Sequence, residues 1–185
     1  VIGEDIRSSY IRNLEHYALR EKKPSPVKIV YSPLHGTGYR IVPQVLSHFG
    51  FTDINIVKAQ EKPDGQFPTV KSPNPEERAA MAMSLDLARE VKADIVLATD
   101  PDSDRMGVAF KNEKGEYVLI NGNQIGTMLE YYILKRKSAA GTLPENSAVV
   151  KTIVTTELQA EIARSFNCRI EDVLTGFKWI ALKMR

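Results

Sequence analysis

The sequence predicts an α/β fold, arranged as two consecutive α/β domains with mixed sheets, of which the second is incomplete. Short apolar runs, typical of buried strands, alternate with segments whose apolar residues follow a helical spacing. Such alternation indicates an α/β domain. A turn signal at 112–115, between two further strand-like runs, adds a hairpin.

The first domain is expected to span residues 1–120. We expect helices at 5–22, 39–49 and 76–91, and strands at 27–31, 54–57, 94–98, 106–110 and 117–120. Pro24 and Pro26 end the first helix, because proline cannot continue it. Gly50 suits the position after the second helix. The third helix begins with acidic residues, which favours its dipole, and a proline-rich loop fills 59–75.

The second domain is expected to span residues 121–185. We expect helices at 124–137, at 157–166 and from about residue 177, strands at 148–154 and 169–173, and a loop at 138–141. Phe177 and Trp179 are expected in the core. The chain begins at Val1 and stops within the last of these helices, so we expect an internal fragment of a larger protein.

The composition is that of an ordinary globular protein, with 43% hydrophobic and 26% charged residues in a chain of 185. The net charge is +2 and no dense basic stripe occurs, which argues against nucleic acid as a partner. No apolar run approaches the ~20 residues of a membrane helix, so we expect no membrane partner. The single cysteine, Cys168, excludes an internal disulfide and fits a reducing cytoplasm, so a cytoplasmic location is expected.

An acidic loop follows the predicted strand at 94–98. Asp100, Asp102 and Asp104 alternate in the sequence, so a loop leaving the strand end can turn them toward one point. Clustered carboxylates repel one another unless a positive charge neutralises them. Mg²⁺ takes few protein carboxylates and leaves its other positions to water or a substrate phosphate. Arg105 follows at once and can bind a phosphate in a bidentate manner. The loop therefore predicts a magnesium site that meets a phosphate.

Three other classes of acidic loop share part of this pattern. A calcium EF-hand needs Gly at position six and Glu at position twelve, where this chain has Arg105 and Lys111, so that interpretation fails. A phosphatase resembling the haloacid dehalogenases would use Asp100 as its nucleophile, although Asp104 stands where that motif has Thr or Val. A non-catalytic cation-binding module also remains open.

Several segments resemble one family and occur in that family's order. They are 31–38 (YSPLHGTG), 63–68 (PDGQFP), 73–76 (PNPE), 98–109 around DPDSDR, 121–124 (NGNQ) and 175–180 (TGFKWI). The chain resembles the α-D-phosphohexomutases, the phosphoglucomutases and phosphomannomutases, over nearly its whole length. The resemblance assigns it to the second domain and part of the third.

The resemblance implies the interconversion of hexose 1-phosphate and hexose 6-phosphate through a phosphoserine and a bisphosphate intermediate. It implies Mg²⁺ at Asp100, Asp102 and Asp104. Arg105, Gly176 and Lys178 become substrate-binding candidates. The expected partners are a phosphosugar and the remaining domains of the same polypeptide. Many family members have Gly-Glu where this chain has Ala181 and Leu182, which leaves contacts beyond Ile180 unassigned.

The catalytic serine loop of the family, similar to Thr-Ala-Ser-His-Asn-Pro, is not found in the sequence. No catalytic residue is therefore assigned to this fragment, and the fragment alone is expected to be inactive. The sugar-specificity loop is not found either, so the sequence does not choose among hexose phosphates.

The turn at 35–38 offers two further candidates. His35 either orients a loop, the commoner role of a turn histidine, or acts near substrate. Gly36 and Gly38 are expected to permit a tight turn into a helix, whose N-terminus can bind an anion.

Overall fold

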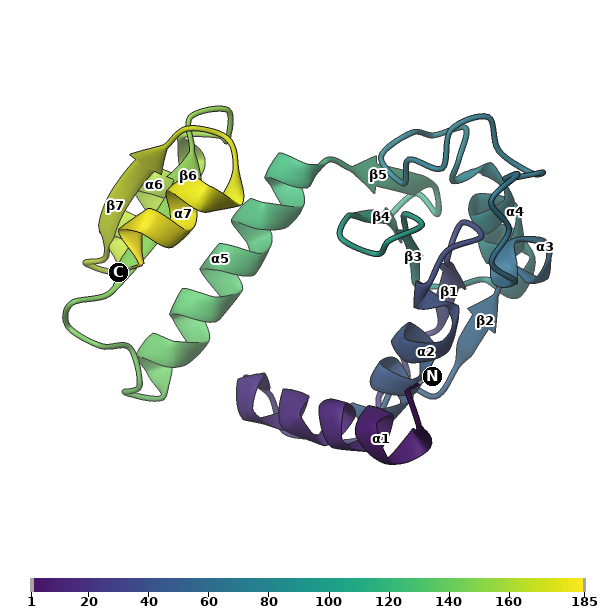
Figure 1. Cartoon of the computed structure of the whole chain (residues 1–185), viewed down its shortest axis with the longest axis horizontal. Helices are drawn as coiled ribbons and strands as arrows, with labels where there is room; N and C mark the ends of the chain where they lie inside the picture. Colours follow the sequence, from purple (N-terminus) through teal and green to yellow (C-terminus); the bar gives the residue numbers. More distant parts are fainter. Residues whose placement is uncertain (1, 185) are drawn as a thin grey trace. The chain divides into compact units, whose positions relative to one another are not determined.

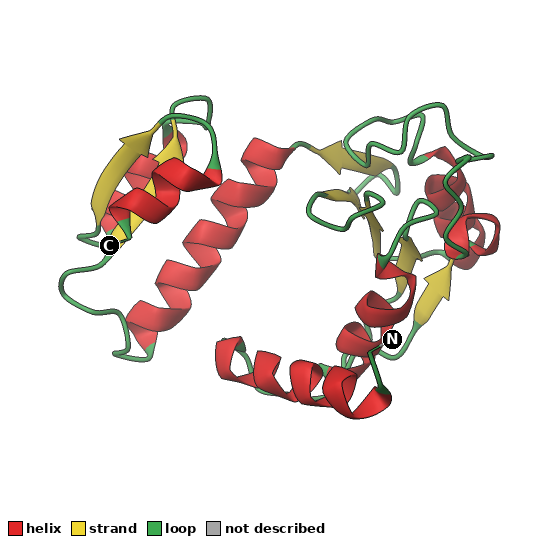
Figure 2. Ribbon diagram, in the orientation of Figure 1, coloured by secondary structure: helices red, strands yellow, loops and turns green. Residues whose placement is uncertain are grey.

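The computed structural model describes residues 2–184 and confirms the α/β class (Figure 1). The chain divides into two compact units: unit 1 runs up to Gly122, and unit 2 begins at Asn123. Unit 1 contains a five-stranded mixed sheet, and unit 2 contains a two-stranded parallel sheet (Figure 2).

The sheet of unit 1 has the strand order β2-β1-β3-β4-β5. Its strands are β1 (Ile29–Ser32), β2 (Ile54–Ile56), β3 (Ile95–Thr99), β4 (Met106–Lys111) and β5 (Tyr117–Ile120). β1 lies between β2 and β3 and is parallel to both. β3, β4 and β5 form an antiparallel meander. The carboxyl ends of β1 and β3 therefore share one edge, where the turn at 33–37 and the acidic loop both begin.

Four α-helices accompany this sheet: α1 (Glu4–Asn13), α2 (Gly38–His48), α3 (Lys58–Glu61) and α4 (Ala82–Val91). Helix α4 packs against β1 and β3, and α1 packs against α2. The buried core joins Val30 and Val96 of the central strands to Leu85 and Ala88 of α4. This core holds β1 and β3 firmly and so fixes the loops at their ends.

The first predicted helix, at 5–22, is too long. Helix α1 ends at Asn13 and passes into a 3₁₀ turn, Leu14–Tyr17, after which Ala18 is extended. Tertiary contacts explain the early end. The Ser25 N–H donates to the Gly50 carbonyl at 2.8 Å, and the Arg20 guanidinium lies 4.7 Å from the centre of the Phe51 ring. These contacts draw the chain along the sheet instead of continuing the helix.

The third predicted helix, at 76–91, starts six residues too early. Residues 76–81 form turns, and α4 has no acidic residue in its first turn, so the dipole argument does not apply. The Asn74 side chain accepts the Glu76 N–H at 3.1 Å, which favours a turn there over a helix. The short helix α3 also overlaps the start of the predicted loop at 59–75, and Gln60 within it is fully buried.

Unit 2 is built from α5 (Gly122–Ala139), β6 (Ala148–Thr152), α6 (Leu158–Ser165), β7 (Arg169–Val173) and α7 (Phe177–Lys183). Strand β7 matches the predicted range, whereas β6 ends two residues early because the Thr155 N–H closes a turn onto the Thr152 carbonyl. Among the described residues β6 and β7 pair only with each other.

A small core in unit 2 gathers Leu134 of α5, Ala163 of α6 and Cys168, which is buried and free. Phe177 was expected in the core. In the part of the chain that the structure describes it is 87% exposed, so that prediction is wrong. No described helix combines the length and the apolar character that crossing a membrane requires.

Candidate metal centre

The acidic loop lies at the carboxyl end of β3, as predicted. Asp100, Asp102 and Asp104 each offer an oxygen, and these oxygens all lie within 4.8 Å of one another. The Asp100 side chain is buried, whereas Asp102 and Asp104 are exposed. Three carboxylates from one five-residue stretch thus converge on a single point at the sheet edge.

Arg105 secures the first carboxylate of the loop. Its backbone N–H donates to Asp100 Oδ1 at 3.0 Å, and its Nε donates to Asp100 Oδ2 at 2.8 Å. Burial by itself raises the pKa of Asp100, but the Arg105 backbone bond, side-chain bond and charge outweigh it and lower that pKa. Asp100 is therefore held as a carboxylate with a fixed orientation.

The other end of the loop carries unneutralised charge. The negative charge of Asp102, with smaller contributions from burial and from Asp100, raises the pKa of Asp104. Arg105 Nε is 3.9 Å from Asp104 Oδ1, too far for a hydrogen bond. The single positive charge of Arg105 therefore does not neutralise the three carboxylates, and the remaining negative charge favours binding of a divalent cation.

The loop geometry fits such an ion. Oxygens that share one Mg²⁺ at about 2.1 Å lie at most about 4.2 Å apart. At least two of the three pairs must be adjacent in an octahedron, where oxygens lie about 3.0 Å apart. No pair in this loop is more than 4.8 Å apart, so binding requires a contraction of at most about 1.8 Å between any two oxygens. Asp102 and Asp104 are exposed and can make that movement, while Asp100 stays in place.

Arg105 itself is placed beside the acidic loop with a side chain that is 56% exposed. Within residues 2–184 its side chain donates hydrogen bonds only through Nε. Both terminal nitrogens of Arg105 can therefore bind another anion. Arg105 thus orients Asp100 through Nε, while the rest of its guanidinium is open to solvent.

His35 is tied into unit 1 by a chain of hydrogen bonds. Its Nδ1 faces the Lys62 carbonyl at 3.3 Å, and its Nε2 lies 2.8 Å from Thr69 Oγ1. Gln60 Nε2 donates to the same hydroxyl at 3.0 Å, while Gln60 Oε1 accepts from Ser32 Oγ at 2.7 Å. These bonds suit an Nδ1–H tautomer in which His35 anchors the segment at 62–69. The geometry favours the loop-orienting role over a role at the substrate.

The remaining predicted site residues lie in unit 2, after the carboxyl end of β7. Gly176 precedes α7 and has a φ of 128°, which side-chain-bearing residues rarely adopt. Lys178 is exposed, and its Nζ lies 5.2 Å from the centre of the Trp179 ring. The structure thus groups Gly176 with Lys178, and groups Arg105 with the acidic loop.

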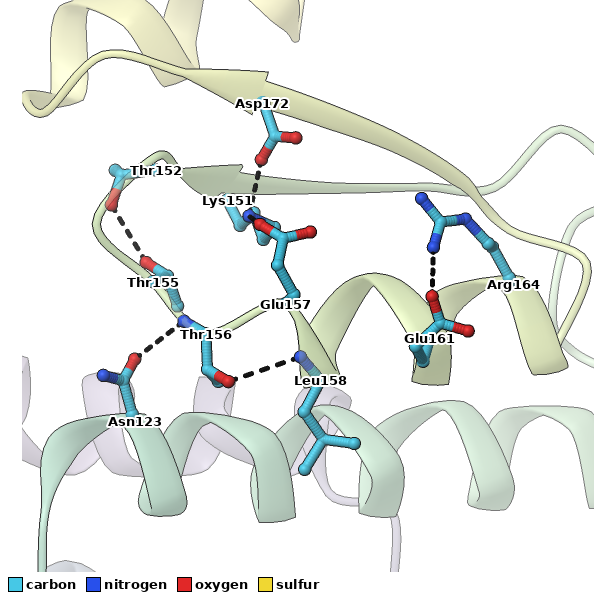
Figure 3. A network of polar contacts seen from close by, with 10 residues as sticks. All are labelled: Asn123, Lys151, Thr152, Thr155, Thr156, Glu157, Leu158, Glu161, Arg164 and Asp172. Atoms are coloured by element: carbon cyan, nitrogen blue, oxygen red, sulfur yellow. Dashed lines mark hydrogen bonds and ion pairs between the residues drawn. The ribbon is translucent and has the colours of Figure 1, made fainter.

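A buried lysine in unit 2 was not predicted from the sequence. Lys151 on β6 has a side chain that is 2% exposed, and its Nζ lies 2.7 Å from both Glu157 Oε1 and Asp172 Oδ1 (Figure 3). The bond to Asp172, followed by the bond to Glu157, raises the pKa of Lys151. Lys151 is the one charged residue of β6, but this pattern does not indicate that its side chain is buried.

The same network orders the loop after β6. Thr152 and Thr155 share a hydroxyl–hydroxyl bond of 2.9 Å, and the Thr156 N–H donates to Asn123 Oδ1 at 3.1 Å (Figure 3). Thr156 Oγ1 in turn accepts the Leu158 N–H at the start of α6. The carboxyl ends of β6 and β7 are thereby joined into one ordered edge within unit 2.

The fold and this site define a chain of α/β/α units with an acidic, arginine-flanked loop at a strand end. Residues 8–115 match the model of phosphoglucomutase/phosphomannomutase alpha/beta/alpha domain II, and residues 121–185 match that of alpha/beta/alpha domain III. The chain belongs to the phosphoglucomutase/phosphomannomutase family.

Curated relatives agree with this assignment. A phosphoglucomutase of Staphylococcus haemolyticus is 36% identical over 184 residues, which is 100% of this chain and 33% of that protein. A phosphoglucomutase of Staphylococcus aureus is 39% identical over 161 residues, which is 87% of this chain and 28% of that protein. The chain spans about a third of the length of these relatives.

Solved structures share the fold. A phosphoglucomutase/phosphomannomutase family protein of Burkholderia thailandensis aligns with a TM-score of 0.74 at 19% identity, covering 97% of this chain and 35% of that one. A putative phosphomannomutase from Thermus thermophilus aligns with a TM-score of 0.71 at 21% identity, over 96% and 38%. An N-acetylphosphoglucosamine mutase of Aspergillus fumigatus, in complex with GlcNAc-6P and magnesium, aligns with a TM-score of 0.59 at 15% identity, over 95% and 35%.

Proposed function

We propose that this chain supplies the cation-binding part of a cytoplasmic phosphohexomutase that interconverts hexose 1-phosphate and hexose 6-phosphate. Residues 1–120 would form its second domain and residues 121–185 part of its third. The observation that carries the proposal is the convergence of three carboxylate oxygens within 4.8 Å beside an arginine, in a chain of this family.

Asp100, Asp102 and Asp104 would hold Mg²⁺ in this proposal. Bound there, Mg²⁺ supplies positive charge that polarises a phosphoserine and offsets charge on the transferred group. Asp100 is already oriented by Arg105 and would provide the fixed ligand, whereas the exposed Asp102 and Asp104 would close on the ion. The serine would come from another domain of the same polypeptide, and the reaction would pass through a bisphosphate.

Arg105, Gly176 and Lys178 would bind the phosphosugar. The terminal nitrogens of Arg105 form no hydrogen bond within residues 2–184, and a guanidinium fork matches a phosphate. Lys178 adds an exposed positive charge, and the open backbone of Gly176 permits close approach of a ligand.

The phosphatase alternative has weaker support. A motif of the haloacid-dehalogenase type has Thr or Val where this chain has Asp104. The Asp104 oxygen instead lies within 4.8 Å of those of Asp100 and Asp102, as a third metal ligand would. Membership of the mutase family favours a ligand role for Asp100.

The proposal is tested in the complete protein that contains this chain. Asp102→Asn removes one formal ligand charge from an exposed residue and is expected to leave the fold intact. We expect a strong loss of hexose 1-phosphate turnover, read in a coupled assay with Mg²⁺ and a bisphosphate primer. Glu113→Gln, in the exposed hairpin turn, is the matched control and should keep full activity. Full activity in Asp102→Asn would refute the metal assignment.

A second arm concerns the isolated chain. It should show no turnover above an Asp100→Ala control, because no phosphorylated serine is assigned to it. Turnover by the isolated chain would mean that it carries its own nucleophile.

A further inference from the structure

Thr37 and the acidic loop are joined through one carbonyl group. The Thr37 N–H donates to the Pro101 carbonyl oxygen at 2.8 Å, and Thr37 Oγ1 donates to the same oxygen at 3.1 Å. Pro101 stands between the proposed ligands Asp100 and Asp102. A single residue directly before α2 thus holds the backbone of the loop that follows β3, 64 positions further along the chain.

The glycines on either side of Thr37 show how closely the two segments fit. A Cβ on Gly36 would lie 2.3 Å from the Pro101 Cα, and a Cβ on Gly38 would lie 2.9 Å from Ser103 Oγ and from Thr99 Oγ1. Each of these separations is shorter than a real Cβ contact. The turn therefore lies directly against the acidic loop, and Gly36 is required at its position because the atoms that it meets are backbone.

The acidic loop needs such a support. Ser103 has a φ of 64°, a left-handed conformation that is unfavourable for a residue with a side chain. The three carboxylate oxygens lie within 4.8 Å of one another, and like charges this close repel. Against these two effects stand the Thr37 bonds to Pro101 and a hydroxyl contact of 3.4 Å between Thr37 Oγ1 and Ser103 Oγ.

We propose that Thr37 is a positioning residue for the cation: it fixes the spacing of the carboxylates without touching the ion. This inference rests on the proposed function, because it assumes that the loop binds a divalent cation. Hydrogen-bonding partners behind metal ligands commonly change metal affinity by 10–100-fold. Removal of the Thr37 hydroxyl leaves the backbone bond intact, so we expect metal affinity to fall by about tenfold, the lower end of that range.

The test measures Mn²⁺ affinity in the complete protein by calorimetry and by the electron paramagnetic resonance of free Mn²⁺. Thr37→Val keeps the shape of the side chain and should weaken Mn²⁺ binding about tenfold, with an unchanged melting temperature once the metal is chelated. Thr37→Ser restores the hydroxyl and should bind within about twofold of the wild type. Thr52→Val is the matched control, since Thr52 is exposed and precedes β2 at the opposite end of the strands. Wild-type affinity in Thr37→Val would overturn the inference.

A second measurement needs no variant. If the bonds of Thr37 to Pro101 favour the cation-binding shape, bound cation must stabilise those bonds to the same degree. Hydrogen exchange of the peptide that covers residues 35–38 should therefore slow by up to about tenfold at saturating Mg²⁺. An unchanged exchange rate with the ion bound would refute the role of Thr37 while leaving the metal centre standing. Failure of the wild type to bind Mn²⁺ or Mg²⁺ would overturn the proposed metal centre and this inference with it.

Discussion

Arg105 contacts both carboxylate oxygens of Asp100, one through its backbone N–H at 3.0 Å and the other through Nε at 2.8 Å. Two different parts of one residue therefore orient the buried member of the acidic loop. The terminal nitrogens of the same guanidinium form no hydrogen bond within the part of the chain that the structure describes, and we propose that they bind a substrate phosphate.

Arg105→Lys is expected to affect both tasks. Lysine keeps the charge and the backbone bond to Asp100 but loses the Nε bond to Asp100 and the fork that matches a phosphate. In the complete protein we expect kcat/KM for hexose 1-phosphate to fall by about tenfold to a hundredfold, mainly through KM. Steady-state kinetics at several phosphosugar concentrations provides the measurement. An unchanged KM together with weaker Mn²⁺ binding would restrict Arg105 to holding the loop.

Gly107→Ala is expected to destabilise unit 1. Gly107 pairs with Ala98 in the sheet, and a Cβ there would lie 2.0 Å from the Pro75 carbonyl oxygen, which is backbone and cannot rotate away. We expect a loss of about 1–3 kcal/mol or more in the free energy of unfolding, measured in urea. Gly65→Ala is the control, because a Cβ at Gly65 has no neighbour within 4 Å, and it should stay within about 0.5 kcal/mol. Equal stabilities would show that the Pro75 segment moves freely.

Stability at alkaline pH is expected to depend on Tyr31. Burial, opposed by the hydrogen bond with Thr99, raises the pKa of Tyr31 from 10.0 to about 12. The unfolded chain then loses this proton near pH 10 while the folded chain keeps it, so stability falls as the pH rises from 10 to about 12. The full effect amounts to at most about 2–3 kcal/mol. Unfolding curves at several pH values test it, and Tyr31→Phe should show a shallower fall. Parallel curves for the two proteins would contradict the assignment.

His35→Asn is expected to loosen the segment at 62–69 and to leave the chemistry unaffected. Asparagine tolerates the left-handed backbone that His35 adopts with a φ of 61°. It does not reproduce the bonds to Lys62 and Thr69. Hydrogen exchange in that segment should become faster, whereas the pH profile of kcat in the complete protein should keep its shape. Loss of one limb of the profile would instead place His35 at the substrate.

The parts of the fold that could be predicted are those decided by local sequence. Apolar runs located β1, β3 and β7 within one or two residues, and their carboxyl ends located the acidic loop. The extended segment after Tyr17 could not be predicted, because its conformation depends on Gly50 and Phe51, which are distant in the sequence. Likewise the turn at 76–81 depends on a side-chain bond from Asn74 that competes with an apparent helical pattern.

The candidate site also has features that local sequence predicts and features that depend on distant residues. The spacing of the three aspartates predicted that their oxygens would converge, and the structure places them within 4.8 Å. The bonds of Thr37 to Pro101 span 64 positions, and nothing local to either segment indicates them. The burial of Lys151 was also hidden, because a lysine in a strand is ordinarily exposed and its partners come from a following loop and a neighbouring strand.

The two strands of unit 2 differ in the side chains along their length. Strand β7 carries Arg169, Glu171 and Asp172, whereas the one charged residue of β6, Lys151, is buried and paired. Exposed charged side chains discourage an incoming strand, and an edge without them invites one. Because β6 and β7 pair only with each other among residues 2–184, each has an edge with unpaired backbone groups. Self-association of the purified chain, and any strand supplied by the rest of a longer protein, should therefore begin beside β6 and not beside β7.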